Sequence, residues 1–193
     1  YFNEAGGHDL EAKVSGFSIS AWVKPTTLAA QKGIAAYRSG DRGGQWLLYW
    51  DAAGRISFVR WSDYQVNVQY YTTAVQLAAG VMAHVVVTFS GSTCTIYING
   101  SSVGVSTAAL GQGWDSTRQL EIGRVYPGTT YSANGVIDEV GIWGRELTAS
   151  EVTSLYNSGT PKAYSTFGST LVLPALLEGD AMRCGFQPIG GGL

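Results

Sequence analysis

The chain has 193 residues, of which 12 are lysine or arginine and 14 are aspartate or glutamate, so its formal net charge is −2 at pH 7. Charged residues make up only 13% of the chain, against roughly 25% in average globular proteins. Without a strongly basic surface the chain is not expected to bind nucleic acid, and with 45% hydrophobic residues it is not expected to be disordered. The length suits one domain, and the longest apolar stretch, 77–89, is too short to span a membrane.

The expected elements are mostly short strands in which apolar and polar residues alternate. In the first, the odd-numbered residues 17–23 are apolar and share one face, Ser18, Ser20 and Trp22 share the other, and Pro25 ends the run. Between two later strands, Asn99-Gly100 is a dipeptide favoured in type I′ hairpin turns. The further strands are expected at 33–38, 45–50, 55–61, 64–73, 84–89, 93–98, 103–105, 119–123 and 135–143.

One helix is expected after the last of these strands. Thr148 and Glu151 have the spacing of a capping box, and Gly159 is a natural stop, so the sequence predicts a helix over 149–158. Many short strands separated by turn residues predict an all-β fold. We expect a two-sheet antiparallel β-sandwich of the jelly-roll kind with one short C-terminal helix.

Four segments occur in an order that resembles the concanavalin A-like lectin/glucanase superfamily, specifically its laminin G-like and pentraxin-like branch. The resemblance implies two antiparallel sheets with a concave and a convex face. It implies a jelly-roll domain over residues 1–160, followed by a C-terminal extension over 161–193. The four segments are 17–25, 84–100, 135–143 and 147–156.

The start of the chain departs from this family pattern. Members of the branch begin with a further strand that pairs with the one over 137–142, whereas only residues 1–10 precede the first hairpin here. The chain is therefore expected to begin inside the domain's first hairpin and to be a fragment of a longer surface protein. The apolar segment 170–177 can fill the missing edge in its own sheet or in a neighbour's. Through residues 163–193 we expect contacts with neighbouring modules or with a second copy of the chain.

Catalysis is not expected. The glucanases of the superfamily place their acids as Glu-x-Asp-x-x-Glu on one strand, which this chain lacks, and the adjacent Asp138 and Glu139 point to opposite faces of a strand. His84 opens an apolar strand, so we expect a hydrogen-bonded core residue rather than a catalytic base. Cys94 is expected to be a buried free thiol, with a disulfide to Cys184 as the alternative.

Calcium is the metal that the resemblance implies. Many relatives hold this ion with Asp carboxylates and backbone carbonyls, which are the hard oxygen ligands that it prefers. Asp138 matches the family's position, and Asn3 and Glu4 can lie near it across the first hairpin. The alternative is that Asp138 accepts a hydrogen bond from a neighbouring backbone, without metal.

Carbohydrate binding is the main functional expectation, because aromatic rings pack on the C–H faces of sugars while Asp and Arg bind sugar hydroxyls. Trp46 and Trp50 share one strand face, so they either pack together in the core or line a surface together. With so many aromatic residues and so few charges, some rings are expected to be exposed at an interface. The candidate contacts are Asp41, Arg42, Trp46, Trp50, Trp61, Asp63, Tyr64, Trp114, Arg124 and Tyr126.

The sequence therefore predicts a non-catalytic recognition or adhesion module that binds glycans or glycoproteins. We expect it to be extracellular, either secreted or on the surface of a cell or virion. The alternative is a structural subunit, such as a virion decoration, a filament subunit or a cell-surface protein, in which the jelly roll and the C-terminal tail make protein–protein contacts.

Overall fold

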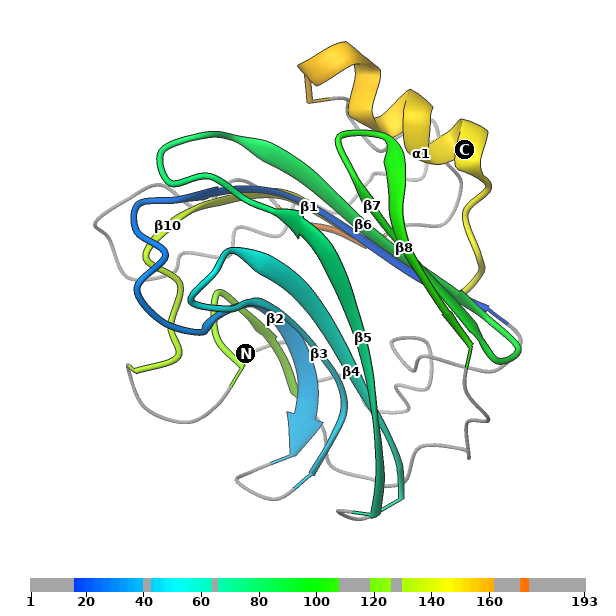
Figure 1. Ribbon diagram of the computed structural model, residues 1–193. Coiled ribbons are helices and arrows are strands. Elements are labelled where there is room, and N and C mark those ends of the chain that lie inside the picture. Colours follow the sequence, from blue (N-terminus) through cyan, green and yellow to red (C-terminus); the bar gives the residue numbers. More distant parts are fainter. Residues whose placement is uncertain are drawn as a thin grey trace, which may run out of the picture.

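The computed structural model describes residues 16–39, 43–63, 66–107, 119–125, 130–161 and 171–173. The strands within them are β1 (Phe17–Pro25), β2 (Lys32–Ser39), β3 (Gly43–Trp50), β4 (Arg55–Asp63), β5 (Val66–Gln76), β6 (Ala83–Ser90), β7 (Thr93–Ile98), β8 (Ser101–Thr107), β9 (Gln119–Ile122), β10 (Gly135–Trp143) and β11 (Leu171–Leu173). They form a six-stranded sheet in the order β11-β10-β1-β6-β7-β8 and a five-stranded sheet in the order β5-β4-β3-β2-β9. The two sheets pack as a sandwich, which confirms the predicted fold class (Figure 1).

Strand β1 lies near the centre of the six-stranded sheet, between β6 and β10, and both pairings are antiparallel. Its alternating sequence places one set of side chains in the main core and the other set on the outer face of the sheet. Phe17, Ile19 and Val23 are fully buried in the main core between the sheets. Ser18 and Trp22 alternate with them on the opposite, outer face of the sheet, as the pattern predicted.

The main core is dominated by aromatic rings from β1, β3 and β4. Trp46 and Trp50 are both 0% exposed. The ring of Trp46 lies 5.3 Å from that of Phe17 and 6.4 Å from that of Phe58, measured between centroids. The shared strand face of the two tryptophans is therefore the inner one, and they pack in the core.

Cys94 on β7 lies in the same core and is fully buried with a free thiol, as expected. Burial raises the pKa of the Cys94 thiol far above its usual range, so the thiol stays protonated and unreactive. Cys184, the alternative partner, lies outside the described residues.

His84 is a buried, hydrogen-bonded residue, as predicted. It is 0% exposed, and its Nε2 lies 2.7 Å from the Ser20 hydroxyl oxygen. Its backbone N–H donates to the Asn99 side-chain oxygen at 2.9 Å, which ties β6 to the hairpin between β7 and β8. Asn99 and Gly100 have φ of 52° and 78°, the left-handed conformations that a type I′ turn requires.

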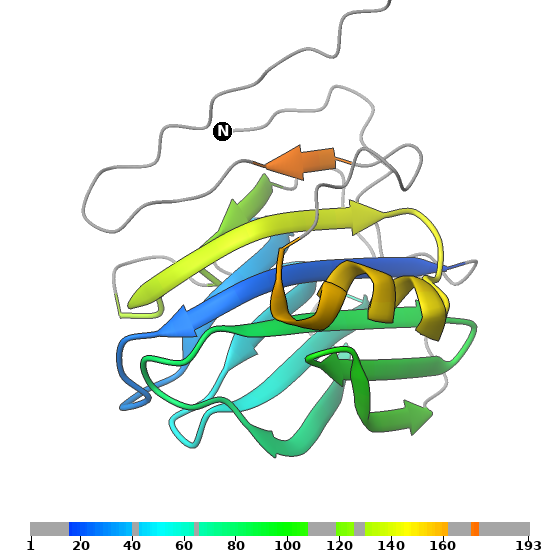
Figure 2. The ribbon, with the colours of Figure 1, turned by 90° about the horizontal axis from the view of Figure 1, so that it is seen from above.

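Helix α1 (Ala149–Tyr156) covers the outer face of the six-stranded sheet (Figure 2). Val152 and Leu155 on the helix pack with Trp143 and Val86 on the sheet in a second, smaller apolar cluster. The helix has eight residues. In the described part of the chain no helix combines the length and apolar character needed to cross a membrane.

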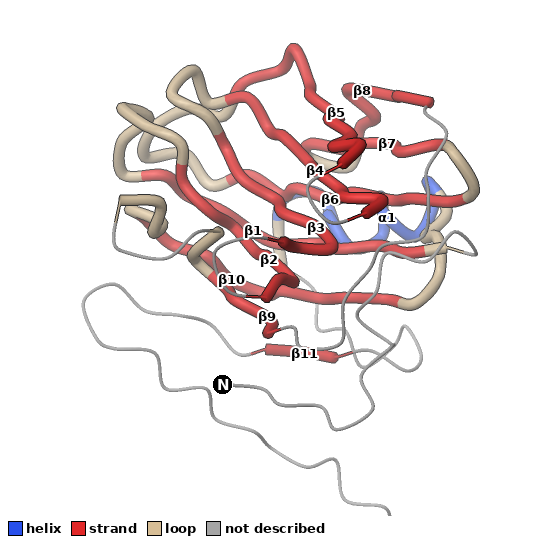
Figure 3. The backbone as a smooth tube through the Cα atoms, turned by 90° about the horizontal axis from the view of Figure 1, so that it is seen from below, coloured by secondary structure: helices blue, strands red, loops and turns tan. Residues whose placement is uncertain are grey.

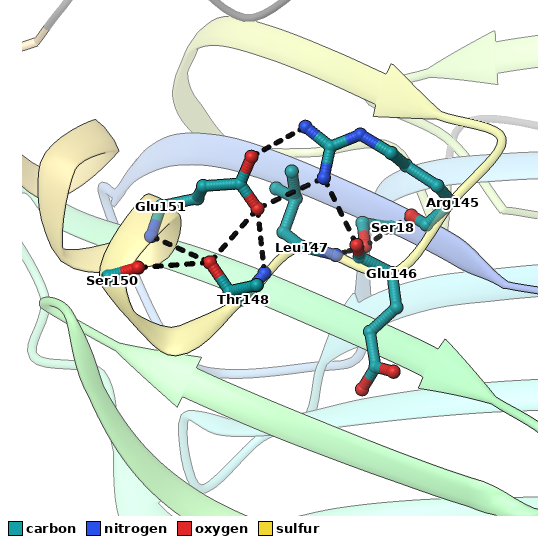
Figure 4. A network of polar contacts seen from close by, with 7 residues as sticks. All are labelled: Ser18, Arg145, Glu146, Leu147, Thr148, Ser150 and Glu151. Atoms are coloured by element: carbon teal, nitrogen blue, oxygen red, sulfur yellow. Dashed lines mark hydrogen bonds and ion pairs between the residues drawn. The ribbon is translucent and has the colours of Figure 1, made fainter.

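The predicted capping box starts this helix (Figure 4). The Glu151 backbone N–H donates to the Thr148 hydroxyl, and the Thr148 backbone N–H donates to the Glu151 carboxylate at 2.8 Å. The guanidinium of Arg145 donates to both oxygens of the same carboxylate, at 2.6 and 3.0 Å. The Ser18 hydroxyl fixes this corner to β1, since it donates to the Arg145 carbonyl and accepts from the Leu147 N–H, both at 2.9 Å.

The predicted end of the helix is wrong by two residues. The helix stops at Tyr156 because Asn157 adopts a left-handed conformation with φ 46°, and its N–H donates to the Thr153 carbonyl. Asparagine reaches this conformation more easily than most residues. Gly159 instead ends the short 3₁₀ turn η1 (Asn157–Gly159) that follows.

Strand β11 is a short piece of the C-terminal segment. Its backbone pairs antiparallel with β10, with Leu173 opposite Val140 and Leu171 opposite Ile142. Three residues of the segment 170–177 thus occupy the edge beside β10 in the chain's own sheet (Figure 3).

Candidate functional site

The outer face of the five-stranded sheet, turned away from the main core, carries an apolar cluster of its own. Its buried part consists of Ala36, Leu47, Val59 and Val125. Ala36 pairs with Leu47, and Leu47 with Val59, so these three form one row across β2, β3 and β4, strands that lie side by side in Figure 3. Three partly buried aromatic residues pack against this cluster: Tyr49, Trp61 and Tyr131. We call these three residues, together with the four buried ones, the aromatic patch.

Strand alternation explains why these rings face outward. Trp46 and Trp50 on β3 point into the main core, so Leu47 and Tyr49 between them point to the outer face. The segment that carries Tyr131 is held against the sheet by a backbone hydrogen bond, in which the Gly33 N–H donates to the Tyr131 carbonyl at 2.9 Å. The patch is therefore built on paired strands and a fixed segment.

An ion network borders the patch at the β9 edge. Glu121 on β9 pairs directly with Ala36 on β2, which places its carboxylate beside the apolar row. Arg38 Nε lies 2.7 Å from one oxygen of this carboxylate, and Arg124 Nη2 lies 2.5 Å from the other. The side chain of Arg38 is 8% exposed, that of Glu121 12% and that of Arg124 38%. The Arg124 guanidinium is thus the group of the network that a ligand in solution can reach most easily.

Gly33 lets the segment with Arg124 lie directly on β2. A Cβ atom at residue 33 would come within 2.6 Å of the Arg124 carbonyl carbon and of the Val125 backbone nitrogen. We expect Gly33→Ala to push this segment off the sheet and to lower the free energy of unfolding by about 1–3 kcal/mol, as overpacking does. Urea denaturation measures the loss.

Gly104→Ala is the matched control for this variant. A Cβ at residue 104 meets its nearest atom, the Thr72 carbonyl oxygen, at an ordinary 3.4 Å, so the stability should hardly change. A Gly33→Ala protein as stable as the Gly104→Ala protein would contradict the close approach at β2.

Two of the candidate ligand contacts must be corrected. Trp46 and Trp50 are fully buried between the sheets, so they offer no ring surface to a sugar. Trp61, by contrast, is half-buried and belongs to the aromatic patch, and Arg124 lies at its edge. The remaining candidates lie outside the described residues or, for Asp63, have a side chain that is not described: Asp41, Arg42, Asp63, Tyr64, Trp114 and Tyr126.

Four residues of this region were not selected from the sequence: Tyr49, Tyr131, Arg38 and Glu121. Tyr49 could have been found, because it must face outward once Trp46 is placed in the core. The contact between Arg38 and Glu121 joins residues 83 positions apart, and no local pattern indicates it.

Asp138, the candidate calcium ligand, lies at an irregularity where β10 pairs with β1. One of its carboxylate oxygens accepts a hydrogen bond from the Glu139 N–H at 2.7 Å. Burial and, after it, the charge of Asp138 raise the pKa of the Glu139 carboxyl. Calcium takes six to eight oxygen ligands, and the described residues contain no group of three acidic, histidine or cysteine side chains that could hold a metal.

The described residues therefore do not by themselves make a calcium site. Asn3 and Glu4, the other expected ligands, lie outside them. Calcium binding stays a prediction, and comparing the unfolding midpoint in calcium with that in EDTA tests it.

A family model described as the concanavalin A-like lectin/glucanases superfamily matches residues 4–153, and the chain belongs to this superfamily. No curated relative matches the sequence. A heptameric SAP-like pentraxin from Limulus polyphemus has a similar structure, with a TM-score of 0.58 at 17% identity. The match covers 82% of this chain and 80% of the pentraxin chain.

Two further solved structures are similar over part of their length. One is a Bacteroides ovatus protein proposed to bind carbohydrate, with a TM-score of 0.58 at 21% identity over 72% of this chain and 40% of its own. The other is botulinum neurotoxin type C, whose cell entry depends on interaction with two ganglioside molecules. The TM-score is 0.57 at 21% identity, and the match covers 76% of this chain and 36% of the neurotoxin chain. The chain spans less than half the length of these two proteins, and the likeness shows a shared fold.

Proposed function

We propose that the chain is a non-catalytic, extracellular recognition or adhesion module that binds carbohydrate on the aromatic patch. The observation that carries this proposal is the arrangement of Tyr49, Trp61 and Tyr131, which are partly exposed around a row of small and aliphatic side chains. Ligand sites typically combine such an apolar surface with a few placed polar groups. Arg124 and Glu121 at the β9 edge supply these polar groups.

The chemistry of a sugar fits this arrangement. The C–H groups on one face of a pyranose ring pack against aromatic rings, and its hydroxyls can accept from a guanidinium and donate to a carboxylate. Exposed aromatic groups on a protein surface commonly mark an interaction site. Proteins of the same fold that interact with gangliosides or are proposed to bind carbohydrate support the proposal.

The proposal of a non-catalytic role rests on the carboxylates of the same face. Most glycoside hydrolases use two carboxyl groups on opposite sides of the scissile bond. Among the described side chains, the carboxylate of Glu121 beside the patch is paired with two guanidinium groups, and that of Asp51, two residues after Tyr49, is paired with Arg55. A carboxylate whose two oxygens both contact guanidinium groups is already engaged within the protein, which supports a binding role for the patch rather than a hydrolytic one.

A glycan array probed with the full chain tests the function, and Trp61→Ala tests the site. We expect the variant to lose about tenfold or more in affinity for any glycan that the chain retains. Tyr97→Ala is the matched control, since Tyr97 is a half-buried aromatic residue on the opposite outer face, and it should bind as the wild type does.

Two outcomes would contradict the proposal. Equal binding by the Trp61→Ala and wild-type proteins would remove the patch as the site. No binding to any glycan, together with loss of self-assembly when residues 163–193 are deleted, would favour the structural subunit instead.

A further inference from the structure

We propose that the carbohydrate ligand is anionic and that its carboxylate or sulfate group binds at Arg124, on the β9 edge of the aromatic patch. This inference rests on the proposed function and names the class of sugar that the patch selects. It is carried by the distribution of charge around the patch, by the geometry of the ion network and by the position of that network beside the apolar row.

The charge at this edge is opposite to that of the whole chain. The described charged residues of β2, β9 and the segments 123–125 and 130–134 are Lys32, Arg38, Arg124 and Glu121, so these segments carry three cations and one carboxylate. The chain as a whole carries a formal charge of −2. The Lys32 ammonium donates to the Thr130 carbonyl at 2.9 Å, next to Tyr131 of the patch. A positive edge on an acidic protein attracts an anionic ligand and orients it.

The ion network holds Arg124 ready for an anion. Glu121 uses one oxygen for Arg38 and the other for Arg124, so one negative charge is shared between two guanidinium groups. Arg38 is almost fully buried, whereas Arg124 is 38% exposed. The contact with Glu121 restricts the Arg124 side chain, which reduces the entropy that ligand binding would otherwise cost. A guanidinium can donate two parallel hydrogen bonds to a carboxylate or sulfate, a geometry that a hydroxyl cannot match.

The network and the aromatic rings adjoin the same apolar cluster. Glu121 is the direct strand neighbour of Ala36, and Ala36 belongs to the apolar row against which Tyr49, Trp61 and Tyr131 pack. The segment with Arg124 also contributes Val125 to the buried apolar cluster of the patch. A sugar ring on the patch can therefore direct an acidic substituent toward the β9 edge.

The test uses pairs of glycans that differ only at the acidic group, bound to the full chain. Oligogalacturonate and its methyl ester test for a carboxylate, and 3′-sulfolactose and lactose test for a sulfate. Both pairs are part of an array in which every acidic glycan has a neutral counterpart. We expect the chain to retain acidic members at least about tenfold more tightly than their neutral partners. The glycan pair that shows this difference identifies the anionic group as a carboxylate or a sulfate. The preference should weaken in high salt, because this attraction is partly solvent-exposed.

Arg124→Gln should remove the preference for acidic members and leave weaker, charge-independent binding. Arg55→Gln is the matched control: Arg55 is also an exposed arginine paired with a carboxylate, that of Asp51, but it is the first residue of β4 and not part of the β9 edge. Its loss should leave the preference unchanged. Neutral and acidic partners bound equally would overturn this inference and leave carbohydrate binding in place. Retention of no glycan, acidic or neutral, would overturn both.

Discussion

Replacing Trp46 with alanine is expected to lower the free energy of unfolding by about 3–5 kcal/mol, the usual cost of removing a buried aromatic side chain. The indole is 0% exposed and packs within 6.4 Å of the rings of Phe17, Phe58 and Tyr37. Its loss would leave a cavity at the centre of the main core and would remove these ring contacts. Because typical domains are stable by only about 5–15 kcal/mol, the variant should unfold at a much lower urea concentration.

Trp61→Ala provides the contrast. Trp61 is half-buried on the outer face, so we expect a stability loss on the order of 1 kcal/mol. The two variants should therefore separate folding from binding: Trp46→Ala weakens the fold, and Trp61→Ala weakens glycan binding while the fold remains. A Trp46→Ala protein that keeps wild-type stability would show that this ring is not in the core.

Acidification should destabilise the chain through His84. The imidazole is fully buried and packs against two aromatic rings, at 5.0 Å from Trp22 and 6.2 Å from Tyr156 between centroids. Burial lowers the pKa of His84 from 6.5 to about 4. Between these values the unfolded chain binds a proton that the folded chain does not, so the free energy of unfolding should fall by about 3 kcal/mol as the pH decreases from about 6.5 to 4.

Urea denaturation between about pH 7 and pH 4 measures this slope. His84→Gln should flatten it, and His8→Gln, which changes the other histidine of the chain, should retain it. Glu151 acts mainly at lower pH, because the hydrogen bond from Arg145 lowers the pKa of its carboxyl from 4.5 to about 2. Titration of the His84 ring protons by NMR gives a test without mutation, and a midpoint near 6.5 would contradict the buried neutral imidazole.

The strands and the start of the helix could be predicted because their signals are local. The alternation over 17–25 is visible in nine consecutive residues, and the capping box needs only Thr148 and Glu151. The end of the helix was missed because two residues, Asn157 and Gly159, could both supply the left-handed stop. The sequence ranks glycine first, but the contacts of the folded chain decide which residue is used.

The candidate site was harder to predict because it depends on which face of each strand is inside. Alternation indicates that Trp46 and Trp50 share a face, but both the core and the surface satisfy that pattern. Only the packing of the two sheets against each other decides that the tryptophan face of β3 points into the core. Tyr49, on the opposite face of the strand, therefore points outward. The network at the β9 edge depends on the pairing of Ala36 with Glu121, a long-range contact that no sequence spacing reveals.

Helix α1 also bears on how the proposed binding surface is presented. It occupies the outer face of the six-stranded sheet (Figure 2), whereas the aromatic patch lies on the outer face of the five-stranded sheet. A domain that binds through one face would increase its overall affinity mainly through multivalency. Several copies bound to one dense surface raise the effective concentration for each further binding event. Crowded targets would then be retained far longer than isolated ones, even when each single encounter is weak.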